Sequence, residues 1–158
     1  MIIAPTLQDK VDIINNCVPM LHNMGIKLPK VALLAANEKV SPDMPATVDA
    51  KAICDMALEN LLPTAIYEGP IAFDVAMSVK AAIKKGIDSK ISGDVDLFLV
   101  PNIETGNCLG KAIGYFAQGI MAGLVLGATH PIIMSSRAAT LKGKITSIAW
   151  ALLAYWQV

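Results

Sequence analysis

The sequence predicts an α/β domain with a mainly parallel sheet and helices on both faces. Segments with apolar residues at helical spacing alternate with short apolar segments typical of strands, which is the pattern of βαβ units. The chain has 158 residues, about one domain, and 54% of them are hydrophobic while only 16% are charged. Buried parallel strands are near-continuous apolar runs, and several such runs occur here.

The first third predicts a helix, a strand and a second helix. The first helix is expected to begin after Thr6, with Asp9 as a capping-box partner, and to end near Gly25. Its apolar stripe has helical spacing: Val11, Ile14, Val18 and Leu21. Pro19 lies inside this stripe and predicts a kink or a local break. A buried strand is expected over 30–35, and the next helix from about Thr47.

The middle of the chain predicts two more strand and helix pairs. A strand over 64–67 is expected to end at the turn residues Gly69 and Pro70. A single helix containing Phe73 and Ile83 should follow, and Gly86 can end it. A strand over 95–100 then leads into a helix over 104–118.

The last third predicts two buried parallel strands, over 120–126 and 132–134, and a final helix from about Thr140. From 148 to 156 that helix is apolar all round, so it needs burial on every side. A helix on the outside of one such domain is not covered in that way. We therefore expect an α/β domain over 1–138 and a C-terminal helix over 139–158 that packs on another domain or subunit.

Composition excludes several classes of protein. The formal net charge is +0, so no electrostatic surplus points to a nucleic-acid binder. The 25 residues over 112–136 lack Asp, Glu, Lys and Arg, but glycines, His130 and Pro131 interrupt them, which argues against a membrane span. The N-terminus has no signal-peptide pattern. We expect a cytoplasmic protein whose cysteines, Cys17, Cys54 and Cys108, are buried reduced thiols, with no metal site.

Polar residues follow the predicted strands where ligands bind in such sheets. Arg137 is the only arginine, and it follows Ser135 and Ser136 just before the last helix. Hydroxyls, a guanidinium and helix N–H groups suit a phosphate or a carboxylate, although a surface arginine near a helix start explains Arg137 equally simply. The segment 101–107 offers Asn102, Glu104 and Asn107 either as a cleft wall or as ordinary caps and turn residues.

Taken together, these segments resemble the phosphate acetyl/butyryl transferase family, and most closely its phosphate butyryltransferase branch. The specific stretches are Pro101-Asn-Ile-Glu-Thr-Gly-Asn107 and the run ending Ser135-Ser136-Arg137. Further similar stretches follow the same order along the chain: 3–7, 30–40, 44–50, 68–74, 85–87 and 93–100. The resemblance implies a three-layer α/β/α fold of the isocitrate/isopropylmalate dehydrogenase kind. It covers only the second domain and the C-terminal helix of a two-domain, usually dimeric, protein.

The resemblance implies exchange of an acyl group, acetyl or butyryl, between coenzyme A and inorganic phosphate, with acyl-CoA and acyl phosphate as substrates and no permanently bound cofactor. By resemblance, Ser136 and Arg137 are the catalytic residues, and Ser135, Asn102, Glu104 and Asn107 bind substrate. Where the family commonly has an acid after Ser-Arg-Ala, this chain has Ala139. A partial chain completed by a first domain or a second subunit is therefore one interpretation. A non-catalytic binding or dimerisation domain is the other.

Overall fold

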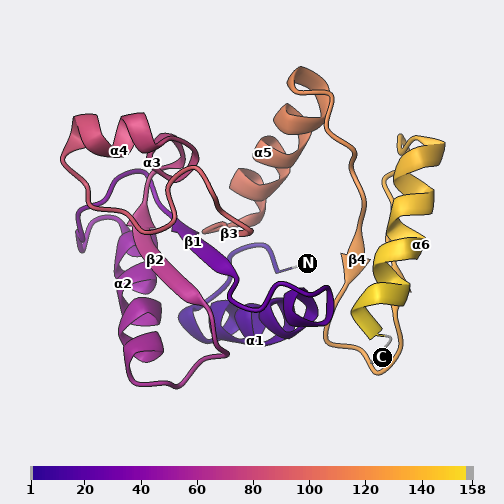
Figure 1. Cartoon of the computed structure of the whole chain (residues 1–158), viewed down its shortest axis with the longest axis horizontal. Coiled ribbons are helices and arrows are strands. Elements are labelled where there is room, and N and C mark those ends of the chain that lie inside the picture. The colour runs from indigo at the N-terminus through magenta and orange to yellow at the C-terminus, as the bar shows by residue number, and fades with distance from the viewer. Residues whose placement is uncertain (1, 156–158) are drawn as a thin grey trace.

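The computed structural model describes residues 2–155 and contains six helices and five strands in that range (Figure 1). In chain order they are α1 (Leu7–Asn23), β1 (Lys30–Leu34), α2 (Pro45–Leu58), β2 (Ile66–Ile71), α3 (Phe73–Met77), α4 (Val79–Lys85), β3 (Leu97–Leu99), α5 (Ile103–Phe116), β4 (Leu124–Val125), β5 (Ile132–Ile133) and α6 (Leu141–Tyr155).

The main sheet is parallel and has the strand order β2-β1-β3. Val31 of the central strand pairs with Tyr67 of β2 and with Leu97 of β3. The predicted α/β class with a parallel sheet is therefore confirmed. Because β1 is covered on both faces, all four residues of 31–34 are buried, as the near-continuous apolar run predicted.

The core has two halves, one on each face of β1. Val31 and Leu33 pack with buried residues of α1 and α2, including Ile14 and Ile53. Ala32 and Leu34 point to the other face, where they meet buried residues of β2, α3, α4 and the loop before β3: Ile71, Val75, Ala76, Ala82 and Ile91. The two-residue period of a strand thus divides one short segment between two helical layers, which lie below and above the sheet in Figure 1.

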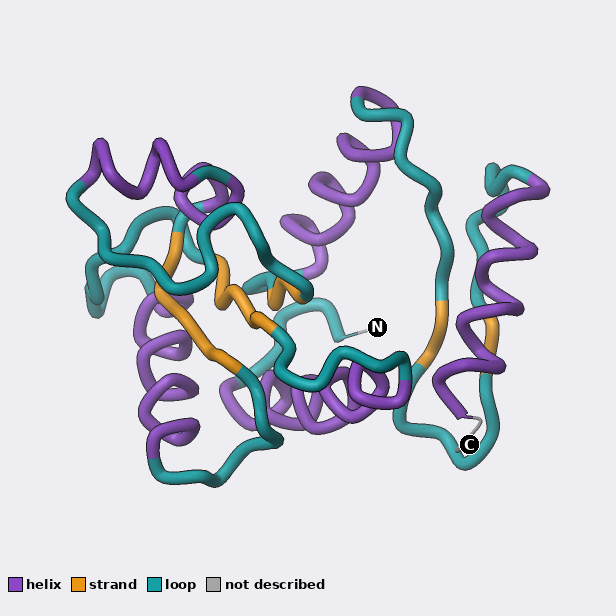
Figure 2. The backbone as a smooth tube through the Cα atoms, viewed as in Figure 1, coloured by secondary structure: helices purple, strands orange, loops and turns teal. Residues whose placement is uncertain are grey.

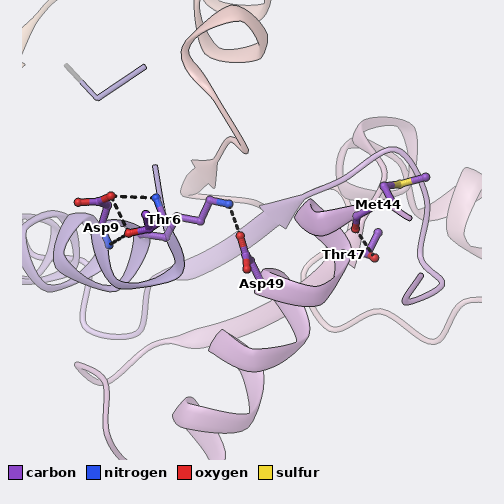
Figure 3. Close-up of polar contacts among 6 residues, drawn as sticks. Thr6, Asp9, Met44, Thr47 and Asp49 are labelled. Carbon is purple, nitrogen blue, oxygen red and sulfur yellow. Dashed lines mark hydrogen bonds and ion pairs between the residues drawn. The ribbon is translucent and has the colours of Figure 1, made fainter. Parts of the chain in front are cut away.

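Several helix ends follow their sequence signals. Thr6 and Asp9 form both halves of the predicted capping box, drawn in Figure 3. Gly86 ends α4 in the left-handed region at φ 68°. Helix α1 runs without a break through Pro19. Of the two outcomes predicted there, the local break is therefore wrong.

The predicted single helix after β2 is wrong, because it is divided into α3 and α4 at Ser78. Ser78 has extended backbone (φ −145°, ψ 113°), and its hydroxyl accepts a hydrogen bond from the Ala81 amide at 3.3 Å. A serine that caps a new helix competes with continuation of the previous one. The apolar residues across 73–83 keep helical spacing through this break, so their pattern alone predicts one helix.

The predicted end of the second strand is also wrong. Gly69 and Pro70 lie inside β2 rather than in a turn after it. A Cβ atom on Gly69 would lie 2.5 Å from Cβ of Leu33, so glycine is present here because two neighbouring strands approach closely. Gly69 and Pro70, which are typical of turns, therefore lie inside a strand here.

The prediction of two further buried parallel strands is wrong. Strand β4 pairs antiparallel with β5 in a separate two-stranded sheet, and Ile132 and Ile133 are 47% and 43% exposed. The connection over 126–131 is too short for a parallel crossover, which needs about a dozen residues or more, whereas it suits a hairpin. We call residues 123–134, with β4 and β5, the hairpin.

Helix α6 packs its small residues inward and leaves its large apolar residues outside. Gly143, Ser147, Ala151 and Ala154 are buried against α1 and the hairpin. The exposed set includes the whole predicted stripe: Leu141, Ile145, Ile148 and Leu152. Figure 2 shows α6 beside the hairpin, and the chain from α5 reaches α6 through long loop segments and the two short strands β4 and β5. The apolar run continues to Trp156, which lies outside the described residues.

Candidate functional site

The carboxyl edge of the main sheet contains a change of direction in the topology. Helix α2, after β1, packs on the face of Val31 and Leu33, whereas Leu109 of α5, after β3, packs on the face of Ala32 and Leu34. Since β1 and β3 are neighbours, the chain leaves them toward opposite faces. In open α/β sheets, ligands bind in the crevice at such a switch point.

Asn102 lies at this edge as the N-cap of α5. Its side-chain oxygen accepts hydrogen bonds from the Thr105 amide at 2.9 Å and from the Thr105 hydroxyl at 2.7 Å. The next amide, of Ile103, donates to the Ile3 carbonyl at 3.0 Å, so the N-terminal segment lies against the same loop. The capping role that the sequence allowed for Asn102 is therefore confirmed. Capping uses the side-chain oxygen of Asn102, whereas its side-chain NH2 group takes no part in it.

Glu104 and Asn107 lie on the first two turns of α5, as the helix predicted over 104–118 implies. They are three residues apart and both are exposed, so they share one face of the helix. Glu104 occupies the first turn, where a carboxylate interacts favourably with the helix dipole. The structure thus presents a carboxylate and an amide together at the carboxyl edge.

Ser135, Ser136 and Arg137 follow β5 in an exposed segment. The Ser136 hydroxyl accepts from the Ala138 amide at 3.3 Å, and Arg137 lies in a turn. Helix α6 begins only at Leu141, and its Gly143 amide donates to Thr140. The expected helix start near Thr140 is therefore confirmed, and Arg137 lies in the short segment just before it. Within residues 2–155, no carboxylate forms an ion pair with Arg137.

The structure does not bring the 102–107 residues and Ser135–Arg137 together. The first belongs to the carboxyl edge of the parallel sheet, whereas Ser135–Arg137 follow a strand of the separate hairpin. Figure 1 shows α5 and the β4–α6 unit as separate arms of the molecule. In the described part of the chain, no hydrogen bond links the 102–107 segment to 135–137.

A partly buried ion pair at the carboxyl edge was not anticipated from the sequence. Lys10 of α1 and Asp49 of α2 lie with nitrogen and oxygen 2.6 Å apart, and they line a small crevice with Val100 and Pro101. Figure 3 shows the contact on Asp49. A signal was present, because each residue lies four positions before a fully buried isoleucine, Ile14 or Ile53, and so shares its helix face.

The cysteines only partly follow their prediction. Cys17 and Cys54 are half-buried, and burial raises the pKa of both thiols, that of Cys54 to about 11. Cys108 is exposed on α5, so its predicted burial is wrong. Among residues 2–155, no cluster of three His, Cys, Asp or Glu side chains is placed to hold a metal ion. None of the helices in that range is long and apolar enough to cross a membrane.

Comparison with known proteins identifies the family. Residues 1–152 match the sequence profile described as "Phosphate acetyl/butaryl transferase". A phosphate butyryltransferase of Clostridium acetobutylicum is 40% identical over 149 residues, covering 94% of this chain and 50% of that protein. A phosphate acetyltransferase of Rickettsia felis is 44% identical over 154 residues, covering 97% of this chain and 44% of that protein.

A solved structure agrees with these sequences. The crystal structure of a branched-chain phosphotransacylase from Enterococcus faecalis V583 superposes with a TM-score of 0.86 at 33% identity, covering 98% of this chain and 55% of that one. This chain thus spans about half the length of the relatives it matches. The match over nearly all of its residues confirms the resemblance noted in the sequence: the chain belongs to the phosphate acetyl/butyryl transferase family.

Proposed function

We propose that this chain forms part of a phosphate acyltransferase, which converts acyl-CoA and phosphate into acyl phosphate and coenzyme A. The carbon–sulfur bond of the thioester breaks, a bond forms from the acyl carbon to a phosphate oxygen, and the CoA thiolate takes up the proton that phosphate loses. The observation that carries the proposal is the family match over 1–152. Coenzyme A is a substrate here, and we place the reaction in the cytoplasm, which suits free cysteines.

Arg137 and Ser136 are the proposed catalytic residues. The guanidinium of Arg137 is exposed and has no carboxylate partner among residues 2–155, so it is available to a phosphate dianion. The Ser136 hydroxyl accepts from Ala138 and keeps its own hydrogen to donate to a developing oxyanion. The hydroxyl of Ser135 is a further hydrogen-bond donor beside Ser136 and Arg137. Asn102, Glu104 and Asn107 are the proposed substrate-binding residues, at the edge where α/β sheets bind ligands.

The test is thiol release from acetyl-, propionyl- and butyryl-CoA, with and without phosphate. Arg137→Ala is compared with Lys142→Ala, which removes a nearby exposed positive charge outside the proposed site. We expect phosphate-dependent release, lowered about a hundredfold or more by Arg137→Ala and little by Lys142→Ala. Equal activity of the two variants would remove Arg137 from the site.

One observation favours a second function, binding of acyl-CoA without turnover. Arg137 is the only arginine in the chain, and no acid occurs between Ala138 and Lys144. One guanidinium only partly compensates a phosphate dianion. Saturable binding of acetyl-CoA without thiol release, measured by calorimetry in the presence of phosphate, would support this second function against the first.

We further propose that the C-terminal helix binds the part of a family-length protein that this chain does not span. Six large apolar side chains on α6 are at least one-third exposed: Leu141, Ile145, Ile148, Trp150, Leu152 and Leu153. Exposed apolar surface of this extent is typical of an interface. The relatives are about twice as long as this chain, so the remaining half is the natural occupant.

This docking proposal is tested by mixing the chain with the unmatched half of the Clostridium acetobutylicum relative. Light scattering should show a one-to-one complex, which Leu152→Glu weakens and Leu58→Glu does not. Leu58 is also exposed, but it lies at the end of α2. A dimer of this chain that excludes the other half would instead assign the α6 surface to a second copy.

A further inference from the structure

Ser147 is a polar side chain with no exposed surface, in the middle of α6. Its hydroxyl donates to the Gly143 carbonyl of its own helix at 2.9 Å and accepts from the Gly123 amide of the hairpin at 3.0 Å. The second bond leaves the helix. Because a partly buried N–H without an acceptor is costly, this bond to the Gly123 amide holds the hairpin to α6.

Gly123 carries the connection onward to the proposed catalytic segment. Its carbonyl accepts from the Met134 amide at 3.2 Å, and Met134 directly precedes Ser135. A Cβ atom on Gly123 would lie 1.9 Å from the Met134 carbonyl oxygen, so the two backbones are in direct contact. Ser147 is therefore two hydrogen bonds away from the residue next to Ser135.

The C-terminal end of α6 is fixed to the α/β body. The Asn23 side chain, at the end of α1, donates to the Ala154 carbonyl at 2.9 Å. Close to Ser147, a Cβ atom on Gly143 would lie 2.4 Å from the Met121 carbonyl oxygen, so α6 and the segment before β4 also touch through their backbones. Helix α6 thus has contacts with the body at one end and with the hairpin along its inner face.

We propose that Ser147 is a positioning residue, which fixes the place of Ser135, Ser136 and Arg137 through Gly123 and Met134. This proposal rests on the proposed function for its consequence in phosphate binding. Within the described residues, the hydrogen bonds of segment 135–137 are local, from the Ala138 and Ala139 amides to Ser136, so the backbone position of this segment depends on the hairpin that precedes it. Ser147 itself touches neither the substrate nor the reacting atoms.

The experiment compares three variants of the full chain. Ser147→Ala removes the hydroxyl. Ser147→Cys keeps a similar volume but offers a poor acceptor, so it separates the hydrogen bond from simple packing. Thr146→Ala is the matched control, because the Thr146 hydroxyl donates to the Lys142 carbonyl at 2.8 Å with the same one-turn spacing and, within the described residues, bonds to no other segment.

Amide exchange and ¹⁵N NMR give the readout, with inorganic phosphate as the probe. In both Ser147 variants we expect the Gly123 amide to exchange about tenfold faster, the amide and Nε resonances of Arg137 to shift, and the Kd for phosphate to rise severalfold. The Ala32 amide of the central strand should keep its exchange rate. Thr146→Ala should change none of these quantities.

Two results would overturn the proposal. One is unchanged Gly123 exchange and unchanged Arg137 resonances in Ser147→Ala. The other is equal acceleration at Gly123 and Ala32, which would make Ser147 a residue of general stability only. If the unsubstituted chain binds no phosphate, the proposed function fails, while the exchange and resonance comparison still decides the positioning role.

Discussion

The Lys10 ammonium and the Asp49 carboxylate lie 2.6 Å apart and join the beginning of α1 to the beginning of α2. Their side chains are 7% and 25% exposed, so solvent screens the pair only partly. Removing one partner of a buried pair leaves the other charge uncompensated, which costs more than the pair contributes as a whole. Breaking this pair is therefore expected to cost more stability than breaking an exposed pair.

We predict that Lys10→Met lowers the free energy of unfolding by about 2 kcal/mol, below the range for fully buried pairs because Asp49 is partly exposed. The double variant Lys10→Met/Asp49→Leu should recover a large part of that loss. Urea denaturation measures both. Lys51→Met is the matched control, since it breaks the half-exposed Lys51–Asp55 pair on α2 and should cost about 0.5 kcal/mol or less. Equal losses from Lys10→Met and Lys51→Met would contradict the prediction.

Gly69 is predicted to tolerate no side chain. A Cβ atom there would lie 2.5 Å from Leu33 Cβ and 2.9 Å from the Leu33 carbonyl oxygen, between β2 and the central strand β1. Gly69→Ala should therefore lower the free energy of unfolding by about 2 kcal/mol through overpacking.

The control for this prediction is Gly110→Ala on α5. A Cβ atom on Gly110 meets only the end of the Met121 side chain, at an ordinary 3.7 Å. Alanine also favours helix over glycine by about 1 kcal/mol, so this variant should be neutral or stabilising. Thermal or urea denaturation of both variants gives the two changes in the free energy of unfolding to be compared. A neutral Gly69→Ala would mean that β1 and β2 separate more easily than their contacts indicate.

The cysteines should differ in reactivity. Burial raises the pKa of Cys54 from 9.0 to about 11, which lowers its thiolate fraction at pH 8 roughly a hundredfold. Cys108 is exposed. We expect iodoacetamide to label Cys108 first at pH 8, with Cys54 reacting only after unfolding in urea. Mass spectrometry of the digested protein locates the label, and early labelling of Cys54 would contradict its burial.

The parts of the fold that could be predicted are those set by local chemistry. Thr6 and Asp9 fix the start of α1, Gly86 fixes the end of α4, and the apolar run before Ala35 identifies the buried central strand. Each signal acts within a few residues. The family itself was also evident, because its motifs are short and specific and follow one another in order.

The errors arose where a local pattern has two possible structures. An apolar run does not distinguish a parallel strand from one arm of a hairpin, so β4 and β5 were assigned to the wrong sheet. Gly69 and Pro70 are turn residues by propensity, and only the approach of Leu33 explains their place inside β2. Lys10 was missed because its partner Asp49 is 39 positions away. The helical spacing placed Lys10 and Asp49 each on a buried helix face, but their pairing depends on how α1 and α2 pack, which local spacing does not give.

Alkaline pH should destabilise the protein, with Cys54 and Tyr67 as the groups responsible. Burial raises the pKa of Cys54 from 9.0 to about 11 and that of Tyr67 from 10.0 to about 12. The folded state therefore keeps protons that the unfolded chain loses. The stabilising contribution is complete below pH 9, declines as the pH rises through the unfolded pKa values, and is lost by about pH 12.

Urea midpoints measured between pH 8 and pH 11.5 test this expectation. Tyr67→Phe removes one titrating group together with its hydrogen bond to the Pro63 carbonyl at 2.8 Å. It should lower stability at pH 8 but make the decline with pH shallower, because phenylalanine has no proton to lose. Tyr115→Phe, on the exposed face of α5, is the control and should leave the slope unchanged. A Tyr67→Phe slope equal to that of the unsubstituted chain would show that the Tyr67 hydroxyl ionises as readily in the folded state as in the unfolded one.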